Sequence, residues 1–143
     1  MLQEHLYNII NNSIQAVSDP LNDKKIIRGN IDIKVNRLSV TDAKNKITSP
    51  NRIFINIIDN GGGVNPNDEN KIFKLGFTTK KGKGGTGFGL SAAYEYMQSM
   101  WGGLKSINHY DKGFELELYL EEYTPEYHND IIEKSLLKGK ENE

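Results

Sequence analysis

The sequence predicts a single α/β domain: a two-layer α/β sandwich in which helices cover one face of a mixed β-sheet. Two observations support this fold class. Segments with apolar residues at helical spacing occur on both sides of segments in which apolar and polar residues alternate. A glycine-rich stretch separates the strands of the first half from the second helix. The 143 residues are enough for one domain with a core of its own.

The first half of the chain predicts one helix and two strands. Residues 2–17 have leucine, isoleucine and valine at helical spacing. We expect this helix to end at Ser18-Asp19-Pro20, because proline disfavours helical geometry in the preceding residue. Residues 30–35 alternate apolar and polar side chains, as a half-buried strand does. Residues 52–59 predict a central strand, with the polar residues 36–51 as the hairpin loop between the two.

The second half predicts one helix, a hairpin and a tail. The helix is expected from Thr86 to the glycine pair at 102–103, which stops it. Two strands follow, joined by a turn at residues 111–113. We divide the chain into a domain over residues 1–122 and a tail over residues 123–143. The apolar residues of this tail predict an amphipathic helix at positions 126–138.

The composition excludes several classes of function. The net charge of −1 gives no general attraction to nucleic acid or anionic lipid. The chain has no cysteine, so disulfide scaffolds, zinc–thiolate sites and cysteine nucleophiles are excluded. No apolar run approaches the roughly 20 residues that span a bilayer. We therefore expect a cytoplasmic domain without nucleic-acid partners or direct membrane contact, cut from a longer protein that could itself be membrane-anchored.

Residues 77–91, FTTKKGKGGTGFGLS, suggest bound phosphate. Gly82 to Gly87 formally match G-x-G-x-x-G, but the strand that a dinucleotide fold requires before this pattern is missing. The P-loop pattern fails because Phe77 stands where its first glycine should be, and the protein-kinase loop lacks its H-R-D partner. The stretch does offer a lysine-bearing, glycine-rich loop that runs into a helix, whose free N–H groups attract anions. The alternative is a solvated loop.

Two further groups of polar residues suggest the other ends of a nucleotide. Asp59 ends a buried strand and is followed by Gly61 and Gly63, and its carboxylate can accept a hydrogen bond from an amine such as that of adenine. Asn8 and Asn12 lie four residues apart, hence on one helix face, and an amide oxygen is a suitable ligand for phosphate-bound Mg²⁺. Taken singly, each group is also typical of an ordinary turn or of a hydrated helix face.

Together these segments resemble the Bergerat-type ATP-binding fold of the GHKL superfamily, which includes sensor histidine kinases, gyrase-type topoisomerases, heat-shock chaperones and mismatch-repair MutL. The N box of the family resembles NIINNSIQA (8–16) and its G1 box DNGGG (59–63). The F box resembles IFKLGFTTK (72–80) and the G2 box GGTGFGL (84–90). FTTK followed by GTGFGLS is most similar to sensor histidine kinases of the nitrogen-regulator type.

The resemblance implies a role for each matching residue. Asn12 would bind Mg²⁺, and Asn8 would contact a phosphate or a metal-bound water. Asp59 would bind the adenine amine, with Gly61 and Gly63 making room for the base. The remaining residues would enclose the triphosphate from a lid at about residues 64–86 and from the start of the next helix: Phe73, Phe77, Thr79, Lys80, Gly85, Thr86, Gly87, Phe88, Gly89 and Leu90.

Asn8 favours phosphoryl transfer over hydrolysis. The hydrolysing relatives carry at this position a glutamate that activates water, and an amide cannot take up a proton. Catalysis would consist of positioning and charge neutralisation, with Asn8, Asn12 and Lys80 as the catalytic residues. The resemblance implies that the ATP γ-phosphate passes to a histidine on a separate dimerisation domain of the parent kinase. A response regulator would act downstream in this two-component phosphorelay.

We expect the chain to lack that phosphoacceptor. The family's phosphorylated histidine is usually followed by an acidic residue, whereas Leu6, Tyr110 and Asn129 follow the three histidines here. Two other functions stay open. One is an anti-sigma-factor-type serine kinase, which the FTTK segment disfavours. The other is a non-catalytic ATP-binding interaction module, which the four intact boxes disfavour.

Overall fold

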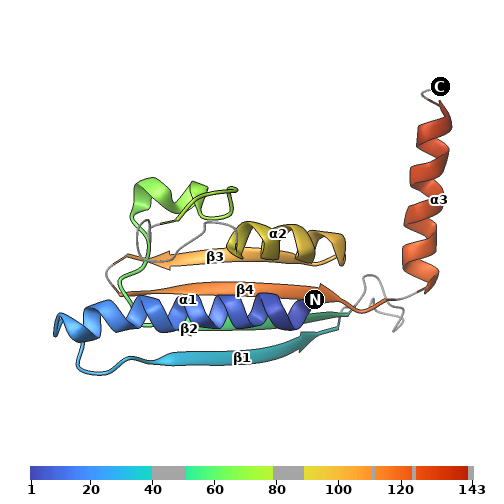
Figure 1. Ribbon diagram of the computed structural model, residues 1–143. Helices are drawn as coiled ribbons and strands as arrows, with labels where there is room; N and C mark the ends of the chain where they lie inside the picture. The colour runs from blue at the N-terminus through green and yellow to red at the C-terminus, as the bar shows by residue number, and fades with distance from the viewer. Residues whose placement is uncertain (40–50, 79–88, 111, 124, 142–143) are drawn as a thin grey trace.

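The computed structural model describes residues 1–39, 51–78, 89–110, 112–123 and 125–141. Their elements are, in order, α1 (Leu2–Asn22), β1 (Ile31–Leu38), β2 (Arg52–Asp59), η1 (Pro66–Lys71), α2 (Gly89–Ser99), β3 (Gly103–His109), β4 (Gly113–Glu121) and α3 (Pro125–Glu141). Figure 1 shows α1 and α2 lying along a single sheet, with α3 standing away from it. The predicted α/β sandwich is confirmed.

The sheet differs from the prediction in one respect. Its strand order is β1-β2-β4-β3, and every neighbouring pair is antiparallel. The expected mixed sheet is therefore wrong for the described residues. The reason lies in the position of β4. In the sequence, β2 and β3 precede and follow α2, and they run in the same direction. In the sheet, β4 lies between these two strands and pairs with both of them.

The core lies between the helices and the sheet. Side chains alternate between the two faces of each strand, so one side of β2 and β4 packs against the helices. A buried cluster joins α1 and α2 to three strands: Ile9, Ile57, Ala93, Met97, Leu104, Leu116 and Leu118. Burying each large side chain of this cluster stabilises the domain by roughly 2 kcal/mol. This core fixes α1 over the sheet, and it thereby positions the polar residues of that helix.

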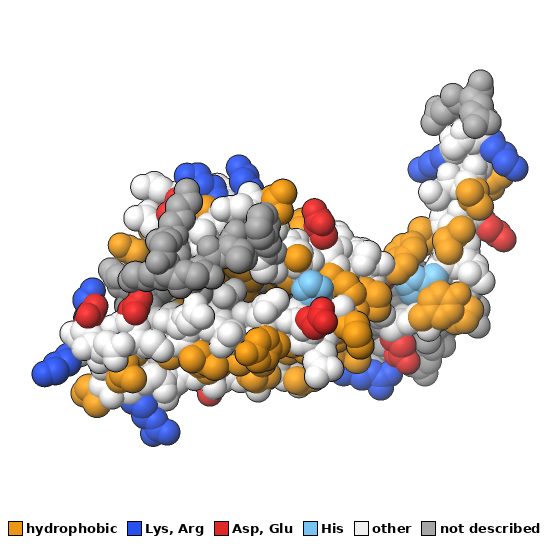
Figure 2. Space-filling model, in the orientation of Figure 1, with side chains coloured by type: hydrophobic (Ala, Val, Ile, Leu, Met, Phe, Trp, Pro, Cys, Tyr) orange, Lys and Arg blue, Asp and Glu red, His pale blue; other side chains and the backbone are white. Residues whose placement is uncertain are grey.

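Helices cover β1 only in part. Ile33 and Val35 pair in register with Ile57 and Ile55, so they point to the helical side of the sheet. Their side chains are nevertheless 53% and 65% exposed, because α1 packs on β2. Figure 2 shows hydrophobic side chains on the flank that α1 and β1 form.

The predicted end of the first helix is wrong, because α1 continues through Pro20 to Asn22. A proline in the last turn removes only one N–H, which would otherwise donate to the carbonyl of Ala16. The N–H of Asp23 donates to the carbonyl of Asp19 at 2.9 Å, so the helix is closed beyond the proline. The carbonyl of Ala16 faces the glycine turn of the candidate site.

The first two strands are close to their predicted bounds. β2 begins and ends where the sequence predicts. β1 continues to Leu38, past the predicted end at residue 35, because its last residues pair with Arg52 and Ile53 of β2. The part of the predicted hairpin loop at positions 40–50 lies outside the described residues.

α2 ends near the predicted glycine pair, but for a different reason. Its left-handed residue is Trp101, with φ of 58°. The N–H of Gly102 donates to the carbonyl of Met97 at 2.9 Å, which is part of a Schellman motif. A Cβ on Gly102 would overlap the carbonyl oxygen of Tyr119 in β4. Gly102 is therefore needed for close approach of the backbones and not for its conformation.

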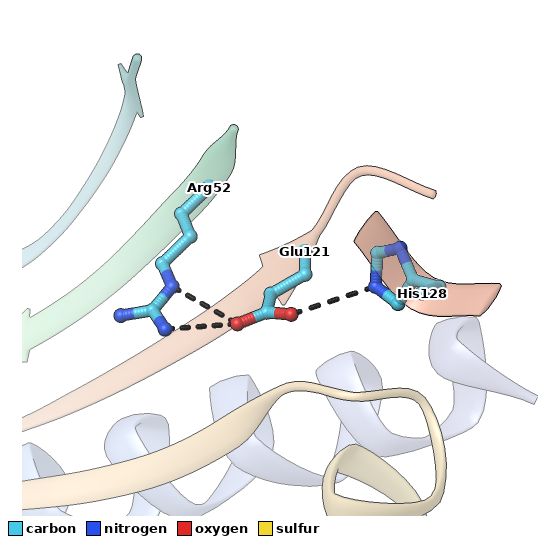
Figure 3. A network of polar contacts seen from close by, with 3 residues as sticks. All are labelled: Arg52, Glu121 and His128. Carbon is cyan, nitrogen blue, oxygen red and sulfur yellow. Dashed lines mark hydrogen bonds and ion pairs between the residues drawn. The ribbon is translucent and has the colours of Figure 1, made fainter. Parts of the chain in front are cut away.

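α3 is held to the domain at its first turn. His128 is 1% exposed, and its Nε2 lies 3.6 Å from Oε2 of Glu121. The other oxygen of Glu121 accepts two hydrogen bonds from Arg52, at 2.8 and 3.2 Å (Figure 3). The rings of Trp101 and Tyr123 each lie 5.2 Å from the His128 ring. Beyond this turn the helix stands away from the sheet (Figure 1).

No helix in the described part of the chain has the length and apolar character to cross a membrane. The helix expected at residues 126–138 is confirmed as α3. The division of the chain at residues 122 and 123 stays a prediction.

Candidate functional site

Asp59 is the last residue of β2, and its side chain is buried where the sheet meets α1. Its Oδ1 accepts a hydrogen bond from the N–H of Gly61 at 2.9 Å. The hydroxyl of Ser13 in α1 and the N–H of Phe114 in β4 face the same carboxylate and favour its charged form. Groups from a helix, a turn and a neighbouring strand therefore surround one carboxylate.

Burial raises the pKa of Asp59 above its ordinary value of 3.8, because the charged form loses its water. The hydrogen bonds from Gly61, Ser13 and Phe114 favour the charged form, but they do not cancel the effect of burial. Carboxyl groups with pKa values shifted by burial are concentrated at binding and catalytic sites. Asp59 is therefore a chemically reasonable acceptor for a ligand amine.

The turn after Asp59 packs tightly against the rest of the protein at two of its three glycines. A Cβ on Gly61 would stand 2.5 Å from the carbonyl oxygen of Ala16 in α1. Gly63 has φ of +71°, and a Cβ there would stand 2.7 Å from Oδ1 of Asn108 in β3. At Gly62 a Cβ would meet nothing within 4 Å. The outer glycines are thus required by the protein's own packing, and their predicted contact with a base stays a prediction.

Ser13 connects the asparagine helix with this turn. It is buried on the same face of α1 as Ile9 and Val17, which lie four residues before and after it. Asn12 directly precedes it and is half-buried, whereas Asn8, one turn earlier, is exposed. Ser13 faces Asp59, and the carbonyl of Ala16 lies against Gly61, so the predicted metal-binding helix packs directly against the predicted base-binding turn.

The first part of the predicted lid is described up to residue 78. The ring of Phe73 stacks on Tyr94 of α2, with centroids 5.2 Å apart and planes 27° apart. Phe77 is half-buried, and its N–H donates to the carbonyl of Lys74 at 3.1 Å. The stacked pair attaches this segment to the helical layer, and the role of Phe73 in anchoring a lid stays a prediction.

Two of the residues predicted to enclose the triphosphate lie at the start of α2. Gly89 and Leu90 are half-buried and begin α2, and Leu90 packs against the core. The following predicted residues lie outside the described ranges: Thr79, Lys80, Gly85, Thr86, Gly87 and Phe88. For these six positions the predicted roles stay predictions.

Three groups that face Asp59 or hold the turn after it were not predicted from the sequence. Ser13 had a recognisable signal, because it is a polar residue at a core position between Ile9 and Val17. Asn108 had no such signal, because a single polar residue in a predicted strand does not indicate which distant residue its side chain contacts. The N–H of Phe114 belongs to the backbone, so the type of side chain could not indicate it.

Comparison with known proteins identifies a family. The family model described as "Histidine kinase-, DNA gyrase B-, and HSP90-like ATPase" matches residues 1–124. Over 59 residues, 41% of this chain, the sequence is 39% identical to the two-component sensor PprA of Pseudomonas aeruginosa. The matched stretch spans only 6% of that sensor's length.

Two solved structures share the fold. The mycobacterial sensor histidine kinase MprB superposes with a TM-score of 0.59 and 16% identity, over 82% of this chain and 68% of that chain. The nucleotide-free catalytic domain of histidine kinase ThkA gives a TM-score of 0.60 and 21% identity, over 84% of this chain and 66% of that chain. At such identities the likeness concerns the fold alone.

Proposed function

Because this chain belongs to the family of histidine kinase-, DNA gyrase B- and HSP90-like ATPases, we propose that it is the Mg-ATP-binding catalytic domain of a sensor histidine kinase. It would donate the γ-phosphate of ATP to a histidine on a separate dimerisation domain of its parent protein. A response regulator would then receive the phosphate. We place the domain in the cytoplasm, as part of a parent that could be membrane-anchored.

The observation that carries this proposal is the packing of α1 against the turn after β2: a Cβ on Gly61 would stand 2.5 Å from the carbonyl oxygen of Ala16, and the Ser13 hydroxyl faces Asp59. Asp59 is the group that would accept the adenine amine, and Ser13 follows the asparagine that would bind the metal. This packing joins two elements that are far apart in the sequence. A nucleotide whose base contacts Asp59 would therefore extend its phosphates along α1, past Asn12 and toward Asn8.

The residues of α1 have the chemistry that a magnesium ion on phosphates requires. Amide oxygens are neutral hard ligands, and Mg²⁺ bound to phosphates takes few ligands from the protein. Asn12 would hold the ion, and Asn8 would hold a phosphate or a water of the ion. When bound, Mg²⁺ neutralises charge on the transferred phosphoryl group.

Asn8 supports transfer to a protein rather than hydrolysis. Activation of water needs a group that takes up a proton, and an amide side chain has no such basicity. The side chain of Glu4, one helical turn earlier, is 77% exposed, so it is a solvated surface carboxylate. Glu4 is therefore not a buried base beside the amides of α1 that would bind phosphate.

Binding and transfer are tested together with purified protein and a separately supplied dimerisation domain that bears a phosphoacceptor histidine. We expect Mg²⁺-dependent ATP binding by calorimetry and γ-label on the added histidine. Without the added domain the chain should stay unlabelled. Asn12→Ala should weaken Mg-ATP binding at least about tenfold and remove its Mg²⁺ dependence. Asp59→Asn should weaken ATP and adenosine alike.

Asn36→Ala is the matched control, because Asn36 is an exposed asparagine of β1. Its ATP affinity should equal that of the wild type. Wild-type affinity in both Asn12→Ala and Asp59→Asn would refute the assignment of the site. ATP binding without any transfer would favour a non-catalytic interaction module, and a stable phosphohistidine on this chain would contradict the expected need for a separate phosphoacceptor.

A further inference from the structure

The side chain of Asn108 pairs with the backbone of Val64 in the way a neighbouring strand would. Its Oδ1 accepts a hydrogen bond from the N–H of Val64 at 2.9 Å, and its Nδ2 donates to the carbonyl of Val64 at 2.6 Å. An amide side chain offers one acceptor next to donors, so a single residue can satisfy both backbone groups of Val64. Asn108 lies near the end of β3, and Val64 directly follows the glycine turn.

A third hydrogen bond determines the orientation of this amide. Its Nδ2 also donates to Oε1 of Glu69 in η1 at 2.5 Å. A flipped amide would place its donors against the N–H of Val64 and its oxygen against the carboxylate of Glu69, so only one orientation satisfies all three partners. The bond to a carboxylate is charge-assisted and strengthens the arrangement.

Gly63 completes the arrangement. Its φ of +71° turns the chain so that Val64 faces Asn108, and a Cβ at this position would stand 2.7 Å from the Asn108 oxygen. The glycine turn is therefore held at both ends. Asp59 holds its beginning by accepting from the N–H of Gly61, and Asn108 holds its end. Gly62, between them, has no neighbour that a Cβ would meet.

We propose that Asn108 is a positioning residue of the nucleotide site: it holds the end of the glycine turn and so fixes the surface on which the base rests beside Asp59. This inference rests on the proposed function, since it concerns the adenine end of the same site. Asn108 itself is occupied by Val64 and Glu69, so it acts through the turn. Its loss should reduce affinity equally for ligands that carry adenine and leave the Mg²⁺ dependence unchanged.

Asn108→Ala tests the proposal directly. The dissociation constants of Mg-ATP and of adenosine should both rise about tenfold, as expected for loss of a paired hydrogen-bonding group. Hydrogen exchange at the amide of Val64 should become faster, because that N–H loses its acceptor. Ile107→Ala is the control, since Ile107 is the preceding residue of β3, points to the opposite face and is 43% exposed. Its dissociation constants should match those of the wild type.

A second pair of variants tests the contact with Glu69. Asn108→Asp keeps an acceptor for Val64 but loses both donors and places two carboxylates side by side, so binding should weaken about as much as in Asn108→Ala. Adding Glu69→Gln supplies a new amide donor and should recover several-fold of the lost affinity. Such recovery depends on the contact itself and not on general stability.

The outcomes separate the inference from the proposed function. If the wild type binds Mg-ATP and Asn108→Ala binds it equally well, the inference is overturned while the proposed function stands. If the wild type binds no ATP, the proposed function fails and the inference falls with it. If Asn108→Ala does not fold, the second pair decides: recovery of adenosine affinity on adding Glu69→Gln supports the inference, and equal affinity with and without this change overturns it.

Discussion

Gly61 illustrates how one residue connects two layers of the protein. The position that a Cβ of Gly61 would take lies against the carbonyl of Ala16 in α1. Pro20, four residues later, supplies no N–H to that carbonyl. The turn after β2 can therefore lie flat against the helix only if residue 61 has no side chain. The sequence suggested that this glycine makes room for a ligand, but the structure shows that the protein itself occupies the space.

The first prediction compares two neighbouring glycines. Gly61→Ala should lower the free energy of unfolding by about 2 kcal/mol, because the new methyl group overlaps the backbone of Ala16. Gly62→Ala is the matched control: its methyl group meets nothing within 4 Å, so stability should be unchanged or slightly higher. Urea unfolding of the two variants measures the difference. Equal stability of both would contradict the close packing at Gly61.

Asp59 predicts a pH dependence of stability. Burial raises its pKa in the folded protein above the ordinary 3.8, so between these two pKa values the folded state binds the proton more tightly than the unfolded state. The stability that Asp59 contributes is complete below pH 3.8 and is lost as the pH rises through the folded pKa.

Asp59→Asn removes this titration and leaves all others in place. The free energy of unfolding of the wild type, measured relative to this variant at each pH, should fall as the pH rises above 3.8 and then level off. Urea unfolding over a pH series gives this difference. A difference that does not depend on pH, or one that rises with pH, would contradict the raised pKa.

The elements differ in how far their sequences specify them. β2 is an apolar run bounded by turn residues, and its bounds were predicted correctly from sequence. The end of α1 was predicted wrongly. The preference of proline against helical geometry in the preceding residue is local, and the hydrogen bonds of the last turn overcome it. α2 ends at Ser99, close to the predicted stop at the glycine pair, yet the residue in the left-handed conformation is Trp101 and not a glycine.

α3 depends on its first turn for contact with the domain. His128 is buried among Glu121, Trp101 and Tyr123, while Leu136 and Leu137 farther along are each 62% exposed. A helix of 17 residues is marginally stable in water unless it packs on something. Its attachment should therefore depend on the His128 contacts.

His128→Ala should make the docking of α3 on the rest of the protein less favourable by about 2 kcal/mol, so that the helix is released. Trp101 is the single tryptophan and touches the His128 ring, so its fluorescence should shift to the red as its exposure rises above 47%. Leu137→Ala, on the exposed part of the same helix, is the control and should leave the emission unchanged. An unchanged emission in His128→Ala would show that α3 is not held by this turn.

At the scale of the whole molecule, the fold brings together residues that are far apart in the sequence. α1 supplies Asn8, Asn12 and Ser13, and β2 supplies Asp59 at its end. The β3–β4 pair supplies Asn108 and the N–H of Phe114 to the same turn. The candidate site is therefore a junction of both layers, which a change in the core between them would also disturb.

Local patterns in the sequence were sufficient for the α/β class, for most elements and for the family resemblance, because apolar periodicity and the four short motifs are properties of neighbouring residues. They could not predict that β4 enters the sheet between β2 and β3, since strand order depends on which distant segments pair. Nor could they identify the partners of Ser13 and Asn108 at the turn, because each contact joins positions that only the folded chain brings within reach.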